Sequence, residues 1–396
     1  MTEVFSKAIL QKIEVNRFIG KVNGTRPGPS VIFFGGIHGN ENSGVVALKK
    51  LFETLRPEAF CGSVYGISGN LKALEIHRRF IEKDLNRLWT LENIKKIRSK
   101  KNPNSEESEL LKILNIIEFI ISYNQPPFYF IDLHSTSSKT LPFITINDAL
   151  INRKFSKQFP VPIILGIEEY LTGPLLSYIN QLGYVSLGFE SGQHDDISAI
   201  NNSVAFINLA LKYSGVLSTQ SPKMDNYFNE LKFQSANLND IFEIIYLYRI
   251  HDGETFKMDD GFKSFQSIHR GKPLARSNSK IIKAPYTGRV FMPLYQTQGA
   301  EGFFIIRVIP PIFLKLSSWF RHLKLDQLLV ILPGVSWANK KQGVLQVNLS
   351  IARFFAKSLF HLLGYRHRQV TRKRLLLYNR ERVAKTAMYK KEQWYW

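Results

Sequence analysis

The segment at residues 31–48, VIFFGGIHGNENSGVVAL, constrains the fold more than any other part of the chain. Its four apolar residues at 31–34 predict a buried strand, and the two glycines that follow permit a sharp turn. Ser43 and the apolar residues after it predict a helix with a capped start. The segment is therefore predicted to run strand, turn, helix, with its polar residues on the turn.

Predicted strands and helices alternate along the next part of the chain. We expect strands at 62–68, 128–133, 143–146, 161–165 and 184–190, and helices at 109–122, 149–158, 174–182 and 197–213. This alternation predicts a doubly wound α/β domain whose sheet is mostly parallel at its centre. Binding sites in such sheets lie at the carboxyl ends of the strands. His38, His134 and Glu190 all fall at such ends.

The pattern changes after about residue 226, and we expect three domains. Residues 1–225 form the α/β domain, and short strands separated by Gly, Pro, Asn and Ser predict a small β-barrel or sandwich at 226–310. Amphipathic helices at 312–332 and 349–364 and a basic, helix-compatible tail ending in QWYW predict a basic helical extension at 311–396.

His38 and Glu41 lie on the turn, three residues apart, so that in a first helical turn both side chains would point to the same side. An imidazole nitrogen and a carboxylate oxygen are good zinc ligands, and a catalytic zinc with two His and one Glu keeps its fourth position open. The bare spacing is weak, however, because His251 and Glu254 repeat it without the glycine turn. A third ligand has to decide between the two pairs.

His134 ends the predicted strand at 128–133 and is the candidate third ligand, with Asp132 two residues earlier on the same face. An acid there can accept the free ring N–H of a ligating histidine. Glu190 ends another apolar strand, where a carboxylate can have a raised pKa and take a proton from water. A structural acid, or a ligand in place of Glu41, are the competing roles for Glu190.

Two polar runs follow predicted strands. Residues 84–87, DLNR, come soon after Arg79 and predict a clamp for an anionic substrate, since arginine offers a planar fork and asparagine a further donor. A solvated helix face is the alternative. Near Glu190, the acids Asp195 and Asp196 are typical of a helix N-cap.

Four motifs in order resemble the succinylglutamate desuccinylase/aspartoacylase family, a branch of the carboxypeptidase-like zinc hydrolases. They are GGIHGNE, the run from residue 70 to DLNR, DLHST and FESGQH, and the resemblance extends to RGKPLARSNSKIIKAPYTGRVFMPLY and GAEGFF, up to residue 308. The resemblance implies a sheet of the zinc carboxypeptidase type and one zinc ion per chain.

The resemblance also implies roles for single residues. His38, Glu41 and His134 match the zinc ligands, Glu190 the general acid/base, and Arg79 the oxyanion-stabilising arginine. Asn86 and Arg87 match the pair that holds the substrate's α-carboxylate. No Arg or Lys occurs at 174–188, whereas aspartate-specific members carry an arginine there, and this departure speaks against acetylaspartate as the substrate.

The expected function is zinc-dependent cleavage of the amide bond of a small, anionic N-acyl amino acid or related carboxylate. A zinc carboxypeptidase acting on peptides is the first alternative, because the ligands do not distinguish the two. A non-catalytic binding protein that uses its basic extension is the second.

Charge and cysteine content limit what we expect of the basic tail, of disulfides and of the cellular compartment. Residues 311–396 contain 17 Lys/Arg and 3 Asp/Glu, which gives +14 of the total net charge of +21. Such a tail can contact an anionic surface or nucleic acid weakly, or can simply be solvated. The single cysteine, Cys61, excludes an intramolecular disulfide, and no leader or membrane-spanning run is expected, so cytoplasm is the predicted compartment. We expect truncation after Tyr365 to leave the enzyme intact, unless QWYW packs on the core.

Overall fold

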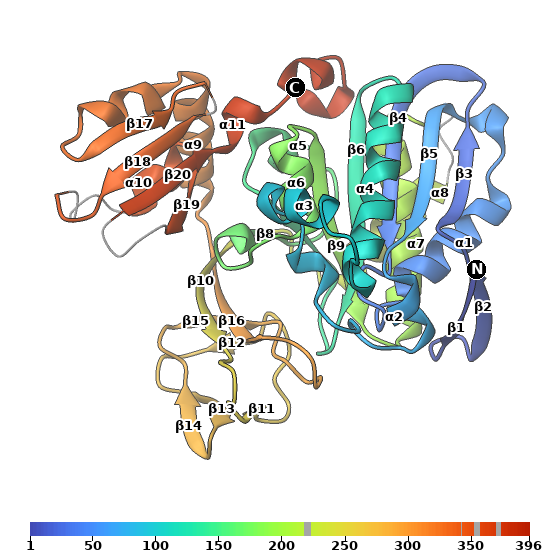
Figure 1. The fold of residues 1–396 in the computed structure, drawn as a ribbon, viewed down its shortest axis with the longest axis horizontal. Helices are drawn as coiled ribbons and strands as arrows, with labels where there is room; N and C mark the ends of the chain where they lie inside the picture. The colour runs from blue at the N-terminus through green and yellow to red at the C-terminus, as the bar shows by residue number, and fades with distance from the viewer. Residues whose placement is uncertain (218–222, 342, 352–356, 370–373) are drawn as a thin grey trace.

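The computed structural model describes residues 1–217, 223–341, 343–351, 357–369 and 374–396, and over these ranges eleven strands form one large mixed sheet (Figure 1). From one edge to the other they are β12 (Ser267–Ile268), β15 (Gly288–Phe291), β16 (Glu301–Val308), β10 (Ile241–Arg249), β8 (Ile163–Leu165), β7 (Phe143–Ile146), β9 (Val185–Gln193), β6 (Phe128–Thr136), β4 (Arg26–Gly35), β5 (Cys61–Ser68) and β3 (Phe18–Asn23). The neighbours β5, β4, β6 and β9 are mutually parallel. The expected α/β class with a mixed sheet is confirmed.

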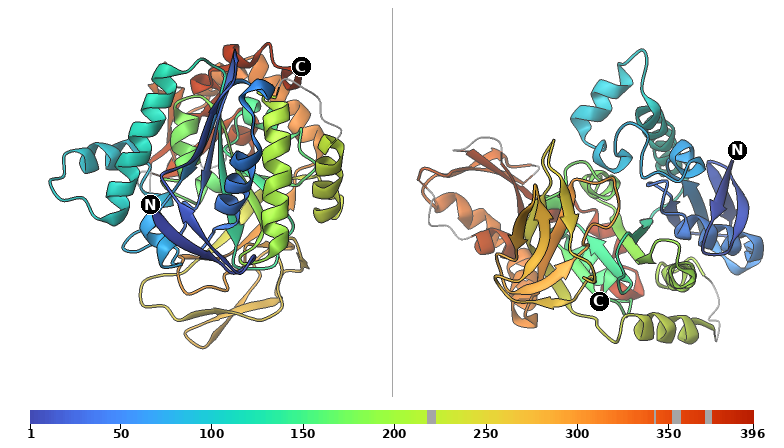
Figure 2. Two further views of the ribbon diagram at one scale, coloured as in Figure 1. Left: turned by 90° about the vertical axis from the view of Figure 1, so that its right-hand side faces the viewer. Right: turned by 90° about the horizontal axis from the view of Figure 1, so that it is seen from below.

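Helices cover both faces of this sheet, because its central strands are apolar on both sides. In β4, Val31 and Phe33 contribute to the core under α1 (Ser43–Thr54), α5 (Leu150–Ser156) and α7 (Ile197–Tyr213), with α8 (Lys223–Gln234) packed on α7. Ile32 and Phe34 point the other way, toward α4 (Ser105–Tyr123), α6 (Leu175–Gln181) and α3 (Leu91–Arg98). Figure 2, left, shows α4 and α7 on opposite sides of the sheet.

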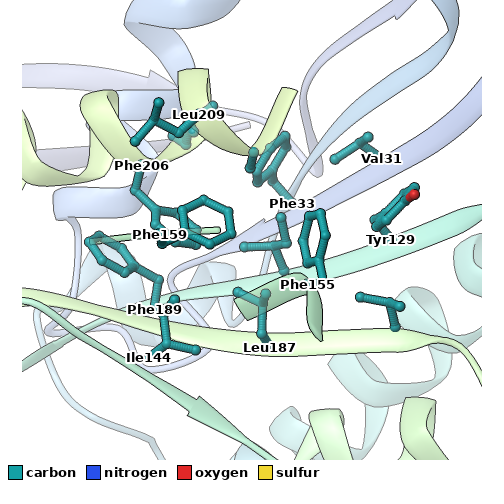
Figure 3. Close-up of a cluster of buried hydrophobic side chains, with 14 of the residues drawn as sticks. Val31, Phe33, Tyr129, Ile144, Phe155, Phe159, Leu187, Phe189, Phe206 and Leu209 are labelled. Carbon is teal, nitrogen blue, oxygen red and sulfur yellow. The ribbon is translucent and has the colours of Figure 1, made fainter. Parts of the chain in front are cut away.

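Aromatic stacking fixes α7 against the end of β9 (Figure 3). The Phe189 and Phe206 rings are parallel with centroids 3.9 Å apart, and Phe159 stacks on the other side of Phe206 at 4.5 Å. Successive side chains of a strand point to opposite faces, so the anchored Phe189 sets the direction of the neighbouring Glu190.

The start of α1 differs from the sequence-based expectation. Ser43 is the first helical residue and not the cap; Asn42 precedes it at the N-cap position and makes no side-chain capping bond. The Ser43 hydroxyl lies instead 3.1 Å from that of Ser191, after Glu190. His38 and Glu41 therefore lie in the loop before the helix and not in its first turn.

The β region at 226–310 shares its sheet with the α/β domain. Strand β10 pairs in parallel with β8, and β16, β15 and β12 extend the same sheet outward. Only β11 (Phe256–Met258), β13 (Pro273–Ser277) and β14 (Lys280–Lys283) form a separate three-stranded sheet. Near the start of the chain, β1 (Thr2–Ser6) and β2 (Gln11–Val15) form a hairpin, and α2 (Leu71–Glu75) is a short helix after β5.

The expectation that residues 311–396 form a helical extension is wrong. Within the described part of this segment, four strands form an antiparallel sheet next to helices: β17 (Val335–Asn339), β18 (Val344–Asn348), β20 (Arg374–Asn379) and β19 (Tyr365–Gln369), with α9 (Pro311–His322), α10 (Lys357–Leu362) and α11 (Arg380–Val383). The expected helix at 312–332 ends at His322 and is followed by the 3-10 segment η4 (Leu325–Ile331). The expected helix at 349–364 falls in part on residues 352–356, which lie outside the described residues. Strands form because Leu345, Tyr365 and Leu377 share one buried core.

The last residues return to the α/β domain, so the expectation that the chain after Tyr365 stands apart from it is also wrong. Tyr389 and Trp394, from η5 (Thr386–Tyr389) and η6 (Gln393–Tyr395), belong to the same core as α5 and β6. The Tyr389 hydroxyl donates to the Phe128 carbonyl at 2.6 Å and accepts from the Val185 N–H at 2.9 Å. These contacts lie at the amino ends of β6 and β9.

Buried charges join the C-terminal unit to the α/β domain. Asp148 accepts hydrogen bonds from Arg153 of α5 at 2.5 Å, from Arg321 of α9 at 3.0 Å and from Arg366 of β19 at 2.6 Å. All four side chains are buried, so the pairing is shielded from solvent. No helix within the described ranges has the length and apolar character needed to span a membrane.

Candidate active site

His38, Glu41 and His134 converge into a compact group of three potential metal ligands. His38 Nδ1 lies 2.9 Å from Glu41 Oε1, and His134 Nδ1 lies 2.9 Å from Glu41 Oε2. One donor atom from each residue lies within 4.8 Å of the others, and all three side chains are buried. The loop after β4 supplies the first two and the end of β6 the third, as expected for neighbouring parallel strands.

The donor set is chemically suited to a divalent metal. Although burial opposes ionisation, the two imidazoles hold the pKa of Glu41 well below its usual value, so Glu41 is a carboxylate. Each histidine directs its other nitrogen at a second acid: His38 Nε2 lies 3.1 Å from Asp84 and His134 Nε2 lies 2.7 Å from Asp132. Acids in these positions fix the ring orientation of ligating histidines.

The role of Asp132 as a partner of His134 was predicted, whereas that of Asp84 was not. Asp84 is 46 residues from His38, and its place in DLNR indicated only an anion clamp. It also accepts two hydrogen bonds from Arg79, at 3.3 and 3.2 Å. Arg79 donates to Glu41 as well, at 3.3 Å, so this arginine is held beside the ligand group.

Glu190 lies beside the group without belonging to it. It is opposite His134 in the parallel pairing of β6 with β9. Its side chain is buried, and Oε2 accepts no hydrogen bond from any residue that the structure describes. Burial raises the pKa of Glu190 to about 8, and the carboxylates of Glu41 and Asp132 add to the increase. A buried acid with a free oxygen and a pKa near neutrality is suited to moving protons.

Asn86 and Arg87 also reach the pocket, but both have partners there. Asn86 Oδ1 accepts the backbone N–H of Leu175 at 2.9 Å, at the start of α6. Arg87 Nη2 donates to Glu301 of β16 at 3.0 Å, and Nη1 donates to the Asn86 carbonyl at 2.9 Å. Glu301 was not predicted, because it follows Asn86 by more than 200 residues in a different region of the chain.

The loop after β15 closes one side of the pocket. Leu294, Gln296 and Glu301 line the same pocket as the metal-ligand group. Gln298, further along this loop, accepts from the Arg79 backbone N–H at 3.1 Å. The β region thus contributes directly to the site.

His194 lines the pocket too, with Nδ1 2.8 Å from the Ser135 hydroxyl. The two acids that follow it have structural roles: Asp196 caps α7 by accepting the Ser198 N–H at 2.9 Å, and Asp195 pairs with Lys7. The N-cap interpretation is therefore confirmed for Asp196.

The second sequence match, His251 and Glu254, lies in an exposed turn after β10. Glu254 accepts the backbone N–H of His251 at 2.9 Å and the hydroxyl of Tyr248. Within the described part of the chain, the metal-ligand grouping contains His38, Glu41 and His134 and neither of these two.

Comparison with known proteins shows a similarity to one family of catalytic domains. Residues 27–202 match the model of the succinylglutamate desuccinylase/aspartoacylase catalytic domain. A probable aspartoacylase from Nostoc sp. is 35% identical over 112 residues, which are 27% of this chain and 35% of the relative, so the match spans about a third of that protein's length.

Solved structures share the fold at low sequence identity. A succinylglutamate desuccinylase/aspartoacylase from Rhodobacter sphaeroides is 18% identical with a TM-score of 0.55, covering 73% of this chain and 88% of its own. A succinylglutamate desuccinylase from Vibrio cholerae is 15% identical with a TM-score of 0.52, covering 72% and 82%. Residues 27–202 are therefore similar to the catalytic domain of the succinylglutamate desuccinylase/aspartoacylase family.

Proposed function

We propose that this protein is a zinc-dependent hydrolase that cleaves the amide bond of a small N-acyl amino acid or related carboxylate. The observation that carries the proposal is the convergence of His38, Glu41 and His134 in one pocket with the buried carboxyl of Glu190, whose Oε2 accepts no hydrogen bond from the described residues. The domain match supports the same chemistry, because the family comprises deacylases.

His38, Glu41 and His134 would hold one zinc ion per chain. When bound, zinc would act as a Lewis acid on the amide carbonyl and would lower the pKa of water in the site. Asp84 and Asp132 accept the outer ring N–H groups of the histidines, which keeps the inner nitrogens free to act as ligands.

Glu190 would move the proton. Its carboxylate takes a proton from the attacking water while a bond forms between the water oxygen and the carbonyl carbon. It then delivers this proton to the amine nitrogen as the C–N bond breaks, so that acid and amine leave and Glu190 returns to its starting form. The free Oε2 provides an atom for this transfer.

Three further residues would bind and orient the substrate. Arg79 lies next to Glu41 with its guanidinium close enough to meet the negative charge that develops on the carbonyl oxygen. Asn86 and Arg87 would hold the substrate carboxylate, as the arginine fork is matched to a carboxylate.

Leu294 and Gln296, in the loop after β15, and Glu301, at the start of β16, line the pocket. These residues narrow the pocket, which supports a small substrate over a peptide. We retain domain limits of 1–225, 226–310 and 311–396 as a proposal, with the middle region capping the site.

A weak contact of the C-terminal unit with anionic surfaces or nucleic acid is a separate proposal. It rests on the +14 charge of residues 311–396 and on the exposed apolar side chains of Ile312 and Trp319 in α9 and of Leu323 directly after it. A non-catalytic protein that uses only this surface would have no need for the intact set of buried site residues.

The test is metal analysis together with hydrolysis of a panel of N-acyl amino acids and dipeptides by the full-length protein. We expect about one zinc per chain and turnover of N-acyl amino acids. Glu190→Gln should keep the metal and lose about 10²–10⁴ in rate. Glu53→Gln, at an exposed position of α1, is the matched control and should behave as the wild type. Zinc loss in Glu190→Gln would make this residue a ligand, and turnover of dipeptides alone would make the protein a peptidase.

A further inference from the structure

Polar residues, among them Ser138, Thr145 and Asn147, line part of the pocket beyond the metal-ligand group, but one stretch of its wall is apolar. Side chains from β7, from the segment after β8, from α6 and from the β region form it: Ile146, Ile167, Leu171, Leu176, Met292 and Phe304. Of the lining residues that the structure describes, only Arg79 and Arg87 carry a permanent positive charge. A charged ligand group placed against this wall would lose its hydration without gaining a partner of opposite charge.

Both arginines already have acidic partners. Arg79 is bound to Glu41 and Asp84, beside the metal-ligand group. Arg87 is bound to Glu301, and both side chains of this pair are largely buried, with 23% and 14% exposed. Arg87 is therefore the arginine left to receive a substrate carboxylate, and the Glu301 carboxylate lies next to it.

These features favour one carboxylate and disfavour two. A single carboxylate can share Arg87 with Glu301, whereas a second would face either the apolar wall or the Glu301 carboxylate. A buried anion without a cation is costly, and like charges brought together at a binding site are strongly disfavoured. An apolar group at the same wall gains from the removal of its surface from water.

We propose that the pocket selects N-acyl amino acids that carry a single carboxylate and an uncharged, apolar side chain, and that Glu301 is a specificity-determining residue that rejects a second carboxylate. This inference rests on the proposed deacylase function and names its substrate class. It sets the chain apart from a hydrolase of dicarboxylic substrates.

The test compares the zinc-loaded full-length enzyme on N-acetyl-leucine and N-acetyl-methionine with N-acetyl-aspartate and N-succinyl-glutamate. We expect kcat/KM to favour the neutral side chains by at least ~100-fold, the order of magnitude for one unpaired buried charge. Glu301→Gln removes the negative charge at nearly constant shape and should shift the ratio toward N-acetyl-aspartate by at least about tenfold.

The matched control is Glu243→Gln. Glu243 pairs with Arg307 at 2.6 Å in the same β region, yet neither residue lines the pocket, so the ratio should not change. Binding to zinc-loaded Glu190→Gln, measured by calorimetry, gives a second readout that needs no turnover. It should be tighter for N-acetyl-leucine than for N-acetyl-aspartate.

The outcomes separate the two proposals. Preference of the wild type for the dicarboxylic substrates, or an unchanged ratio in Glu301→Gln, would overturn the inference and leave the deacylase function standing. Absence of hydrolysis of both classes, together with absence of binding to Glu190→Gln, would overturn the proposed function and this inference with it.

Discussion

Replacement of Trp394 by alanine tests how the C-terminal segment is tied to the catalytic domain. Trp394 has 5% of its surface exposed and lies among aromatic rings of the α/β core. Its ring centroid is 5.2 Å from that of Phe155, 5.7 Å from Tyr389 and 6.2 Å from Tyr129, and its indole N–H donates to the Tyr129 hydroxyl at 3.2 Å.

The size of the effect follows from these contacts. Truncation of a buried Trp to Ala removes its apolar burial and leaves a cavity, which together cost about 3–5 kcal/mol. The lost N–H to hydroxyl bond contributes about 1 kcal/mol within that range. Since Tyr129 and Phe155 belong to β6 and α5, the loss should lower the free energy of unfolding of the α/β domain itself.

The measurement is urea unfolding followed by circular dichroism, with Trp396→Ala as the matched control. Trp396 is two residues further on and 89% exposed, so its removal should change the free energy of unfolding by less than about 0.5 kcal/mol. Equal stability of the two variants would refute the packing of the C-terminal segment on the domain.

Three further predictions concern the metal, the buried charges and the basic unit. His134→Ala should lose zinc by metal analysis while His251→Ala retains it, and full loading of both variants would contradict the ligand assignment. Burial opposes ionisation of Asp148, but its arginine partners hold its pKa well below the usual value. This carboxylate therefore stabilises the fold fully above its unfolded-state pKa of about 4, and the contribution is lost as the pH falls from there through the lower folded-state pKa. Asp148→Asn should accordingly cost about 3–5 kcal/mol at pH 7 in urea unfolding and progressively less in acid, and a pH-independent difference would argue against it. Binding of the full chain to anionic lipid vesicles should fall steeply between ~50 and ~300 mM salt, and a salt-insensitive signal would exclude an electrostatic contact.

Local patterns in the sequence were sufficient for the centre of the site. His38, Glu41, His134 and Glu190 each end an apolar strand or follow its glycine turn, and these features can be recognised within a few residues. Parallel neighbours then place the strand ends side by side, which the pairing of β4, β6 and β9 bears out. Among the described residues, His251 lies outside the potential metal-ligand grouping.

Local patterns failed where long-range pairing decides the structure. The run of basic residues at 366–391 is compatible with a helix, yet β20 forms because β18, more than 20 residues earlier, offers a strand edge and a shared apolar core, and β19 then pairs with β20. The burial of Trp394 likewise depends on α5 and β6, whose residues lie over 200 positions away.

The sequence by itself determined the chemistry available to this protein, because ligand type, acid type and strand ends are properties of short segments. The tertiary structure decided how that chemistry is used. It brought Asp84 to His38, buried Glu190 with its Oε2 free of hydrogen bonds from the described residues, and placed Glu301 of the β region against Arg87. Such contacts join residues that are distant in the chain, and no local pattern encodes them, because they depend on the register and packing of the whole sheet.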